Sequence, residues 1–93
     1  MTYHSFHFFV SGRVQGVSFR AFAKRAAQEG GIVGWVRNHP SGDVEGVAQG
    51  PADALAKFKK ALEVGPKQAH VTNVHITDEK KVDQPEYRGF EVR

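Results

Sequence analysis

The segment GRVQGVSFR, residues 12–20, holds residue types that suit the binding of a phosphate group. Gly12 and Gly16 allow backbone with positive φ and a close approach to a ligand. The residues that follow have the pattern of a helix, and the first N–H groups of a helix have no internal partners. Loop and helix N-terminus together could form a concave set of N–H donors with a positive end, which favours an anion.

Arg20 is the charged side chain best placed to serve such a site. A cation in the first helical turn opposes the helix dipole, at a cost of a few tenths to ~1 kcal/mol. Helical side chains lean toward the N-terminus, so Arg20 would reach over the loop and clamp a bound dianion through two hydrogen bonds. Residues 11–40 carry five basic side chains against one acidic one, which is compatible with an anionic partner. The alternative interpretation is an exposed Arg with no ligand.

Other common phosphate and metal chemistries are excluded by the residues themselves. The chain has no cysteine, which excludes thiolate catalysis, iron–sulfur clusters and Cys-based metal sites. Neither the Gly-Lys-Ser/Thr ending of a nucleotide P-loop nor a Rossmann glycine fingerprint is present. His4, His7, His70 and His75 show no metal-ligand spacing. We therefore expect no metal site.

The hydrophobic pattern predicts five strands and two helices. An apolar stripe formed by Phe19, Phe22, Ala23, Ala26 and Ala27 indicates an amphipathic helix that ends at a glycine pair. Pro51 is typical of a first helical position. The expected strands cover residues 3–11, 32–38, 43–49, 71–76 with an extension toward Val82, and 90–93, and the expected helices cover 19–29 and 51–64.

This order of elements predicts the fold class. A β-α-β-β-α-β order gives a ferredoxin-like α+β sandwich, with two helices on one face of an antiparallel sheet. The last segment adds a short C-terminal edge strand. A chain of 93 residues with 40% hydrophobic and 25% charged residues fits one globular domain over residues 1–93. This fold hosts many unrelated functions, so the fold alone does not indicate one.

Residues 12–20 also resemble the signature of the acylphosphatase family. GWVRN at 34–38 and VEGVAQGP at 44–51 are similar to the two parts of its second signature, and GFEV at 89–92 is similar to the family's end. The resemblance covers nearly the whole chain and is least distinctive over 67–87. It implies hydrolysis of the carboxyl–phosphate bond of acyl phosphates, without metal or cofactor.

The resemblance also implies roles for individual residues. Asn38 would position the attacking water, and the guanidinium of Arg20 would hold the phosphoryl group. The loop residues whose amides would bind the phosphoryl group are Gln15, Gly16, Val17, Ser18, Phe19 and Arg20. Ser18 stands where the family often has a larger residue, and we expect its hydroxyl to cap the helix rather than to contact phosphate.

These few residues could suffice for the reaction. A carboxylate leaving group is a weak base that needs no general acid, and a loose phosphoryl-transfer transition state asks mainly for positioning and charge stabilisation. His39 is the rival base, because it adjoins Asn38 and histidine titrates near neutrality. Neighbours on an extended chain point to opposite faces, so we assign His39 to the turn instead.

Two further function classes stay open. An RNA-binding module of the same element order is one, since FFV at 8–10 and RGFEV at 88–92 partly resemble its two motifs. The longer motif belongs on the third strand, where aromatic side chains stack bases, and here that strand is acidic and has no aromatic residue. The other class is a phosphate-binding or adaptor domain without turnover.

The expected partners are an acyl phosphate substrate and inorganic phosphate, as product and inhibitor, with no nucleic acid and no membrane. No apolar run approaches the ~20 residues of a membrane-spanning helix. The segment MTYHS at 1–5 lacks the pattern of a signal peptide. We therefore expect a cytoplasmic monomer. The identity of the acyl group is not indicated by any segment.

Overall fold

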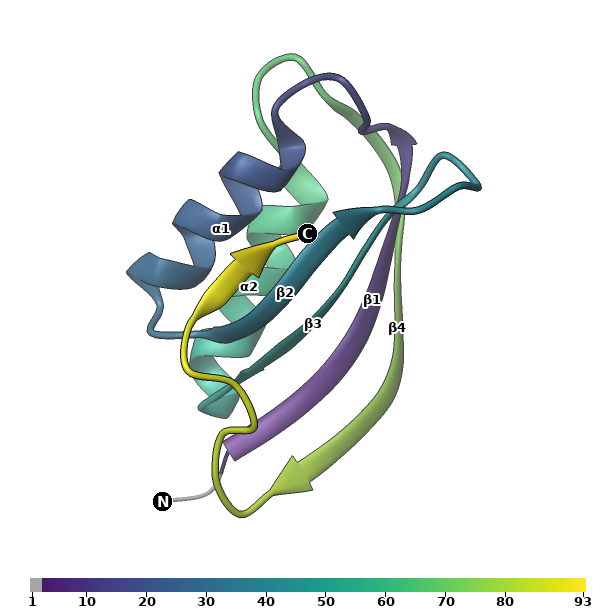
Figure 1. Cartoon of the computed structure of the whole chain (residues 1–93). Coiled ribbons are helices and arrows are strands. Elements are labelled where there is room, and N and C mark those ends of the chain that lie inside the picture. The colour runs from purple at the N-terminus through teal and green to yellow at the C-terminus, as the bar shows by residue number, and fades with distance from the viewer. Residues whose placement is uncertain (1–2) are drawn as a thin grey trace.

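A computed structural model describes residues 3–93, so that Met1 and Thr2 of the expected domain lie outside the described residues. The elements are β1 (Tyr3–Arg13), α1 (Phe19–Glu29), β2 (Val33–Asn38), β3 (Val44–Gly50), α2 (Ala52–Val64), β4 (His70–Val82) and β5 (Phe90–Val92). Both helices lie on one face of the sheet, and the opposite face is left open (Figure 1). The ferredoxin-like sandwich predicted from the sequence is confirmed.

The sheet has the strand order β4-β1-β3-β2-β5. Its first four strands pair antiparallel, as expected. The short C-terminal edge strand β5, whose direction the sequence left open, pairs parallel with β2, so the sheet is mixed. The chain leaves β4 at one edge, crosses the end of the sheet and enters the other edge in the direction of β2 (Figure 1).

A buried glutamine holds the crossing segment in place. The side chain of Gln49 on β3 accepts a hydrogen bond from the backbone N–H of Glu86 at 2.8 Å and donates one to its carboxylate at 2.6 Å. It also donates to the hydroxyl of Ser5 at 3.2 Å. With only 1% of its surface exposed, Gln49 meets the requirement that buried polar groups be hydrogen-bonded.

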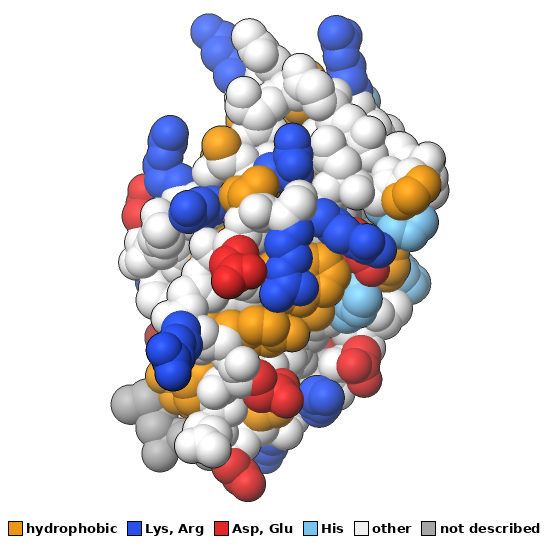
Figure 2. Space-filling model, in the orientation of Figure 1, with side chains coloured by type: hydrophobic (Ala, Val, Ile, Leu, Met, Phe, Trp, Pro, Cys, Tyr) orange, Lys and Arg blue, Asp and Glu red, His pale blue; other side chains and the backbone are white. Residues whose placement is uncertain are grey.

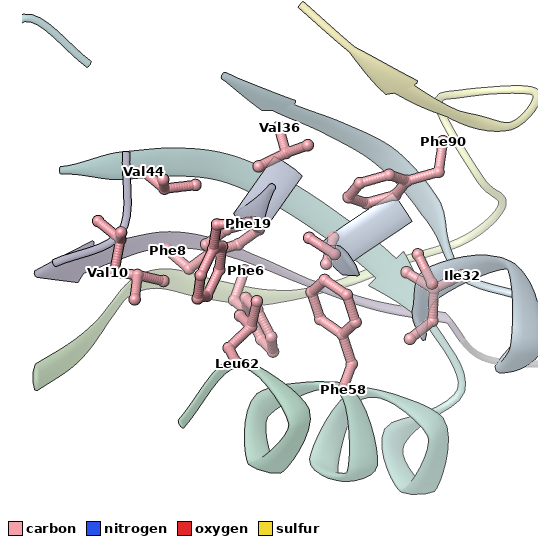
Figure 3. Close-up of a cluster of buried hydrophobic side chains, with 14 of the residues drawn as sticks. Phe6, Phe8, Val10, Phe19, Ile32, Val36, Val44, Phe58, Leu62 and Phe90 are labelled. Atoms are coloured by element: carbon pink, nitrogen blue, oxygen red, sulfur yellow. The ribbon is translucent and has the colours of Figure 1, made fainter. Parts of the chain in front are cut away.

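The core lies between the sheet and the two helices. Alternate residues of β1 point toward the helices, so Phe6, Phe8 and Val10 are buried while their neighbours face the open side. The ring of Phe58 on α2 packs against Phe8 at 5.7 Å between ring centroids and against Phe90 at 5.8 Å (Figure 3). Burial of each such side chain contributes about 1.5–3 kcal/mol, which fixes the helices on the sheet.

Candidate active site

The loop between β1 and α1, residues 14–18, is anchored by alternating burial. Val14 and Val17 are 1% and 7% exposed and belong to the core, whereas Gly16 and Ser18 face solvent. Phe19, the first residue of α1, is also buried. Apolar side chains on both sides therefore hold the exposed backbone of this loop in one conformation.

Gly12 and Gly16, the two glycines of residues 12–20, have different roles. Gly12, with φ 120°, lies at the end of β1, and a Cβ there would collide with the backbone carbonyl of His70 on β4. Gly12 therefore serves the pairing of two strands and not the approach of a ligand. Gly16, with φ 76°, has open space where a side chain would stand, so its backbone is accessible from solvent.

Ser18 occupies the N-cap position of α1, but the prediction that its hydroxyl caps the helix is wrong. Its backbone is left-handed, with φ 60° and ψ 27°, and its side chain makes no cap hydrogen bond. A capping side chain requires extended backbone at that residue, which explains the difference. Only the Ser18 carbonyl takes part, accepting the N–H of Phe22 at 3.1 Å.

The backbone N–H groups of this loop find no hydrogen-bond partner among the described residues. Over residues 3–93, no hydrogen bond is donated by a backbone N–H of residues 15–20. These donors lie at the N-terminus of α1, where the helix dipole is positive. The loop and the start of the helix therefore carry backbone donors that remain available, which is the feature that an anion-binding site at a helix N-terminus requires.

Arg20 and Asn38 both line a depression of about 410 Å³ beside this loop. The depression lies between the N-terminus of α1 and the ends of β2 and β5. Its lining residues are Val14, Gly16, Ser18, Phe19, Arg20, Ala21, Asn38 and Val92. Figure 2 shows several Lys and Arg side chains around this end of the molecule.

The guanidinium of Arg20 is held by one long contact. Its Nη1 donates to the backbone carbonyl of Arg93 at 3.3 Å in an exposed position. The backbone N–H of Arg93 in turn donates to the carbonyl of Val36 on β2 at 2.8 Å. This contribution of residues 92 and 93 could not be predicted from the sequence, because it depends on the parallel pairing of β5 with β2.

Not every predicted loop residue lines the depression. Gly16, Ser18, Phe19 and Arg20 do, together with Asn38. Val17 points into the core. The side chain of Gln15 turns away to the hairpin between β2 and β3, a contact that the sequence reasoning missed. For Gln15 and Val17, only the backbone amides are available to the predicted site.

His39 lies on the other side of the sheet from Asn38. Its ring packs edge-on against Phe9 of the open face, with 5.9 Å between ring centroids. Its Nδ1 accepts the backbone N–H of Ser41 at 3.0 Å within the turn. These contacts agree with the assignment of His39 to the turn.

A charged cluster on the open face fixes the strand that carries Asn38. Glu45 on β3 accepts hydrogen bonds from Arg37 at 2.6 Å and from His7 at 2.8 Å, and its side chain is only 8% exposed. Burial acts to raise the pKa of Glu45, but the hydrogen bonds from Arg37 and His7 outweigh it and hold this pKa below the ordinary value of 4.5. Because Arg37 precedes Asn38, the pair secures β2 against β3 next to the depression.

The two segments that partly resemble RNA-binding motifs, residues 8–10 and 88–92, do not both expose an aromatic side chain on which a base could stack. Phe8 and Phe90 are 0% and 5% exposed and face the helices. Phe90 also lies on the edge strand β5 and not on β3.

Among the described residues, no group of three or more His, Asp or Glu side chains is placed to hold a metal ion. No helix in that part of the chain is long and apolar enough to cross a membrane.

The fold defines a class of small α+β domains, the ferredoxin-like sandwiches. Within that class, the acylphosphatase family model matches residues 6–92. The acylphosphatase of Thiobacillus denitrificans is 44% identical, over 94% of this chain and 93% of its own length. That of Nitrosococcus oceani is 49% identical, over 90% and 91% of the two chains. The chain therefore belongs to the acylphosphatase family, whose members are hydrolases.

Solved structures agree with this assignment. The crystal structure of acylphosphatase from Bacillus subtilis superposes with a TM-score of 0.87 at 34% identity, covering 97% of this chain and 98% of that one. An acylphosphatase structure from Coxiella burnetii gives a TM-score of 0.85 at 40% identity, covering 98% and 93%. Both cover nearly the whole chain, so the fold as a whole is shared.

Proposed function

We propose that this chain hydrolyses acyl phosphates through the depression that holds Arg20 and Asn38. The products are a carboxylate and inorganic phosphate. The observation that carries the proposal is that one depression is lined both by residues of the loop and α1, Arg20 among them, and by Asn38 at the end of β2. The backbone N–H groups of residues 15–20 have no partner among the described residues. Family membership supports the same reaction.

Binding begins with the phosphoryl group at the loop. Its oxygens accept hydrogen bonds from the N–H groups of residues 15–20 and from Arg20. The bond from Arg20 to the carbonyl of Arg93 is long and exposed, so a dianionic ligand displaces it at small cost. Arg20 and the helix N-terminus then supply the positive charge that the transition state requires. The proposal assigns no role to a metal or cofactor.

Attack comes from a water that Asn38 positions. The Asn38 carboxamide oxygen accepts a hydrogen bond from the water and holds it in line with the departing carboxylate. A new bond forms between the water oxygen and phosphorus, while the bond from phosphorus to the carboxylate oxygen breaks and its electron pair leaves with the carboxylate. One water proton passes to a phosphoryl oxygen. Because the leaving group is a weak base, no general acid is needed.

Turnover of a simple aryl acyl phosphate in the presence of EDTA tests the proposal. We expect hydrolysis at the same rate with and without chelator, and competitive inhibition by inorganic phosphate. Loss of activity with EDTA that a divalent ion restores would overturn the metal-free reaction. Phosphate binding without turnover would favour a silent phosphate-binding domain instead. That the protein is monomeric and cytoplasmic remains a prediction from the sequence.

A further inference from the structure

The side chain of Gln15 leaves the phosphate-binding loop and bonds the hairpin between β2 and β3. Its Nε2 donates to the backbone carbonyls of His39 at 2.8 Å and Asp43 at 2.9 Å. Both partners are acceptors, so the amide nitrogen must face them and both of its N–H bonds are used. The contact joins residues that are far apart in the sequence and is partly buried.

The two carbonyls that Gln15 contacts close the hairpin turn. The N–H of His39 donates to the Asp43 carbonyl at 2.8 Å, and the N–H of Gly42 donates to the His39 carbonyl at 3.0 Å. A carbonyl oxygen can accept two hydrogen bonds. Gln15 therefore completes the bonding of both carbonyls, and one of them belongs to the residue directly after Asn38.

This arrangement links the two halves of the site. The phosphoryl-binding groups lie on the loop and on α1, whereas Asn38 lies at the end of β2. A misplacement of about 1 Å between reacting groups can cost on the order of 10²-fold in rate. Gln15 belongs to the loop and holds the hairpin, so it couples the position of Asn38 to the phosphoryl group.

We propose that the Gln15 side chain is a positioning residue for hydrolysis, which acts by holding the Asn38 hairpin in register with the phosphate-binding loop. The inference rests on the proposed function and adds a role for the side chain to the one given to the Gln15 backbone amide. It assigns the side chain to the alignment of water and not to the affinity for phosphate.

Gln15→Met is the test variant, because methionine has similar length and no donor. We expect kcat to fall roughly 10-fold. The inhibition constant for inorganic phosphate should stay within about twofold, because the loop N–H groups and Arg20 remain. Gln28→Met, at an exposed glutamine of α1, is the matched control and should change neither quantity. Urea unfolding of each variant establishes that the assayed chains are folded.

Repeating the substitution in an Asn38→Ala background separates positioning from general structure. If Gln15 acts through Asn38, Gln15→Met lowers kcat in the wild-type chain and has no further effect once Asn38 is absent. Equal losses in both backgrounds, or a phosphate inhibition constant that worsens as much as kcat, would overturn the inference. Turnover by the wild-type chain tests the proposed function separately.

Gln15→Glu supplies a second variant of native shape. Its carboxylate cannot donate and would face two carbonyl oxygens, so kcat should fall at neutral pH as in Gln15→Met. Protonation restores one O–H donor. The ratio of kcat for Gln15→Glu to that for Gln15→Met should therefore rise as the pH falls toward the carboxyl pKa. A ratio that does not change with pH would contradict the hydrogen-bonding role.

Discussion

Asn38 and His39 are adjacent residues whose side chains serve different faces of the sheet. Asn38 lines the depression with Arg20, and His39 packs on Phe9 within the turn. We predict that Asn38→Ala lowers kcat by roughly 10²-fold or more, the scale of losing one well-aimed polar group. The phosphate inhibition constant should stay near the wild-type value, because the loop and Arg20 are untouched. Steady-state kinetics with added phosphate measure both quantities.

His39→Ala is the control for this prediction. It removes a ring that bonds Ser41 but leaves the backbone carbonyl that Gln15 holds, so kcat should change little. The assignment would be reversed by a pH–rate limb near ~6.5, the pKa of an unperturbed histidine, that disappears in His39→Ala.

Some properties of single residues could be predicted from the sequence and others could not. The family resemblance assigns Arg20 and Asn38 to one site, and both residues line the same depression. The left-handed backbone of Ser18 and the reach of Gln15 to His39 were not expected. Both features depend on the burial of Val14 and Val17, which fixes the loop against the core. Local sequence propensity does not describe such tertiary packing.

At the scale of elements, the cluster around Glu45 makes the pairing of β1, β2 and β3 sensitive to acid. The pKa of Glu45 is lowered in the folded chain relative to 4.5. Its stabilising contribution is therefore complete above the unfolded pKa and is lost as the pH falls through the folded pKa. We predict that the free energy of unfolding decreases below about pH 4.5 and that Glu45→Gln weakens this decrease. Urea denaturation from pH 7 to about pH 3 measures both.

Glu91→Gln is the matched control for the acid prediction. Glu91 pairs with Arg93 at 3.3 Å, but its side chain is 68% exposed, so water screens the pair. The pH dependence of this variant should match that of the wild-type chain. Identical acid profiles for Glu45→Gln and the wild-type chain would show that the cluster does not contribute.

The two helices and β1 were predictable because each has a clear period. The stripe from Phe19 to Ala27 repeats at helical spacing, and β1 alternates between buried and exposed residues. The direction of β5 was not predictable, because three residues carry no period and either orientation buries Phe90. Its direction follows instead from the crossing segment that Gln49 anchors.

At the scale of the whole molecule, phosphate binding should stabilise the fold. A ligand that binds only the folded chain adds about 1.4 kcal/mol at ten times its Kd. For a domain of this size that corresponds to an increase in Tm of about 6–11 °C. We predict such an increase with inorganic phosphate and a much smaller one with chloride at equal ionic strength. Differential scanning calorimetry provides the comparison.

The same experiment locates the ligand. Arg20→Lys keeps the charge but loses the planar donor pair, so the phosphate-induced increase in Tm should shrink. Arg25→Lys, at an exposed position on the same helix, should behave as the wild-type chain does. Equal increases in both variants would contradict a phosphate site at Arg20.

The strand order has a consequence for how the chain reaches this structure. β1 pairs with residues 44–50 and with residues 70–82, and β2 pairs with residues 90–92, so the sheet joins distant parts of the chain. Each such pairing requires closure of a long loop, and the entropy cost of that closure precedes the stabilising contacts between the strands. Folding should therefore be slow for so short a chain, on the order of milliseconds to seconds. The depression needs α1, β2 and β5 together, and a refolding chain acquires it only as the distant pairings form.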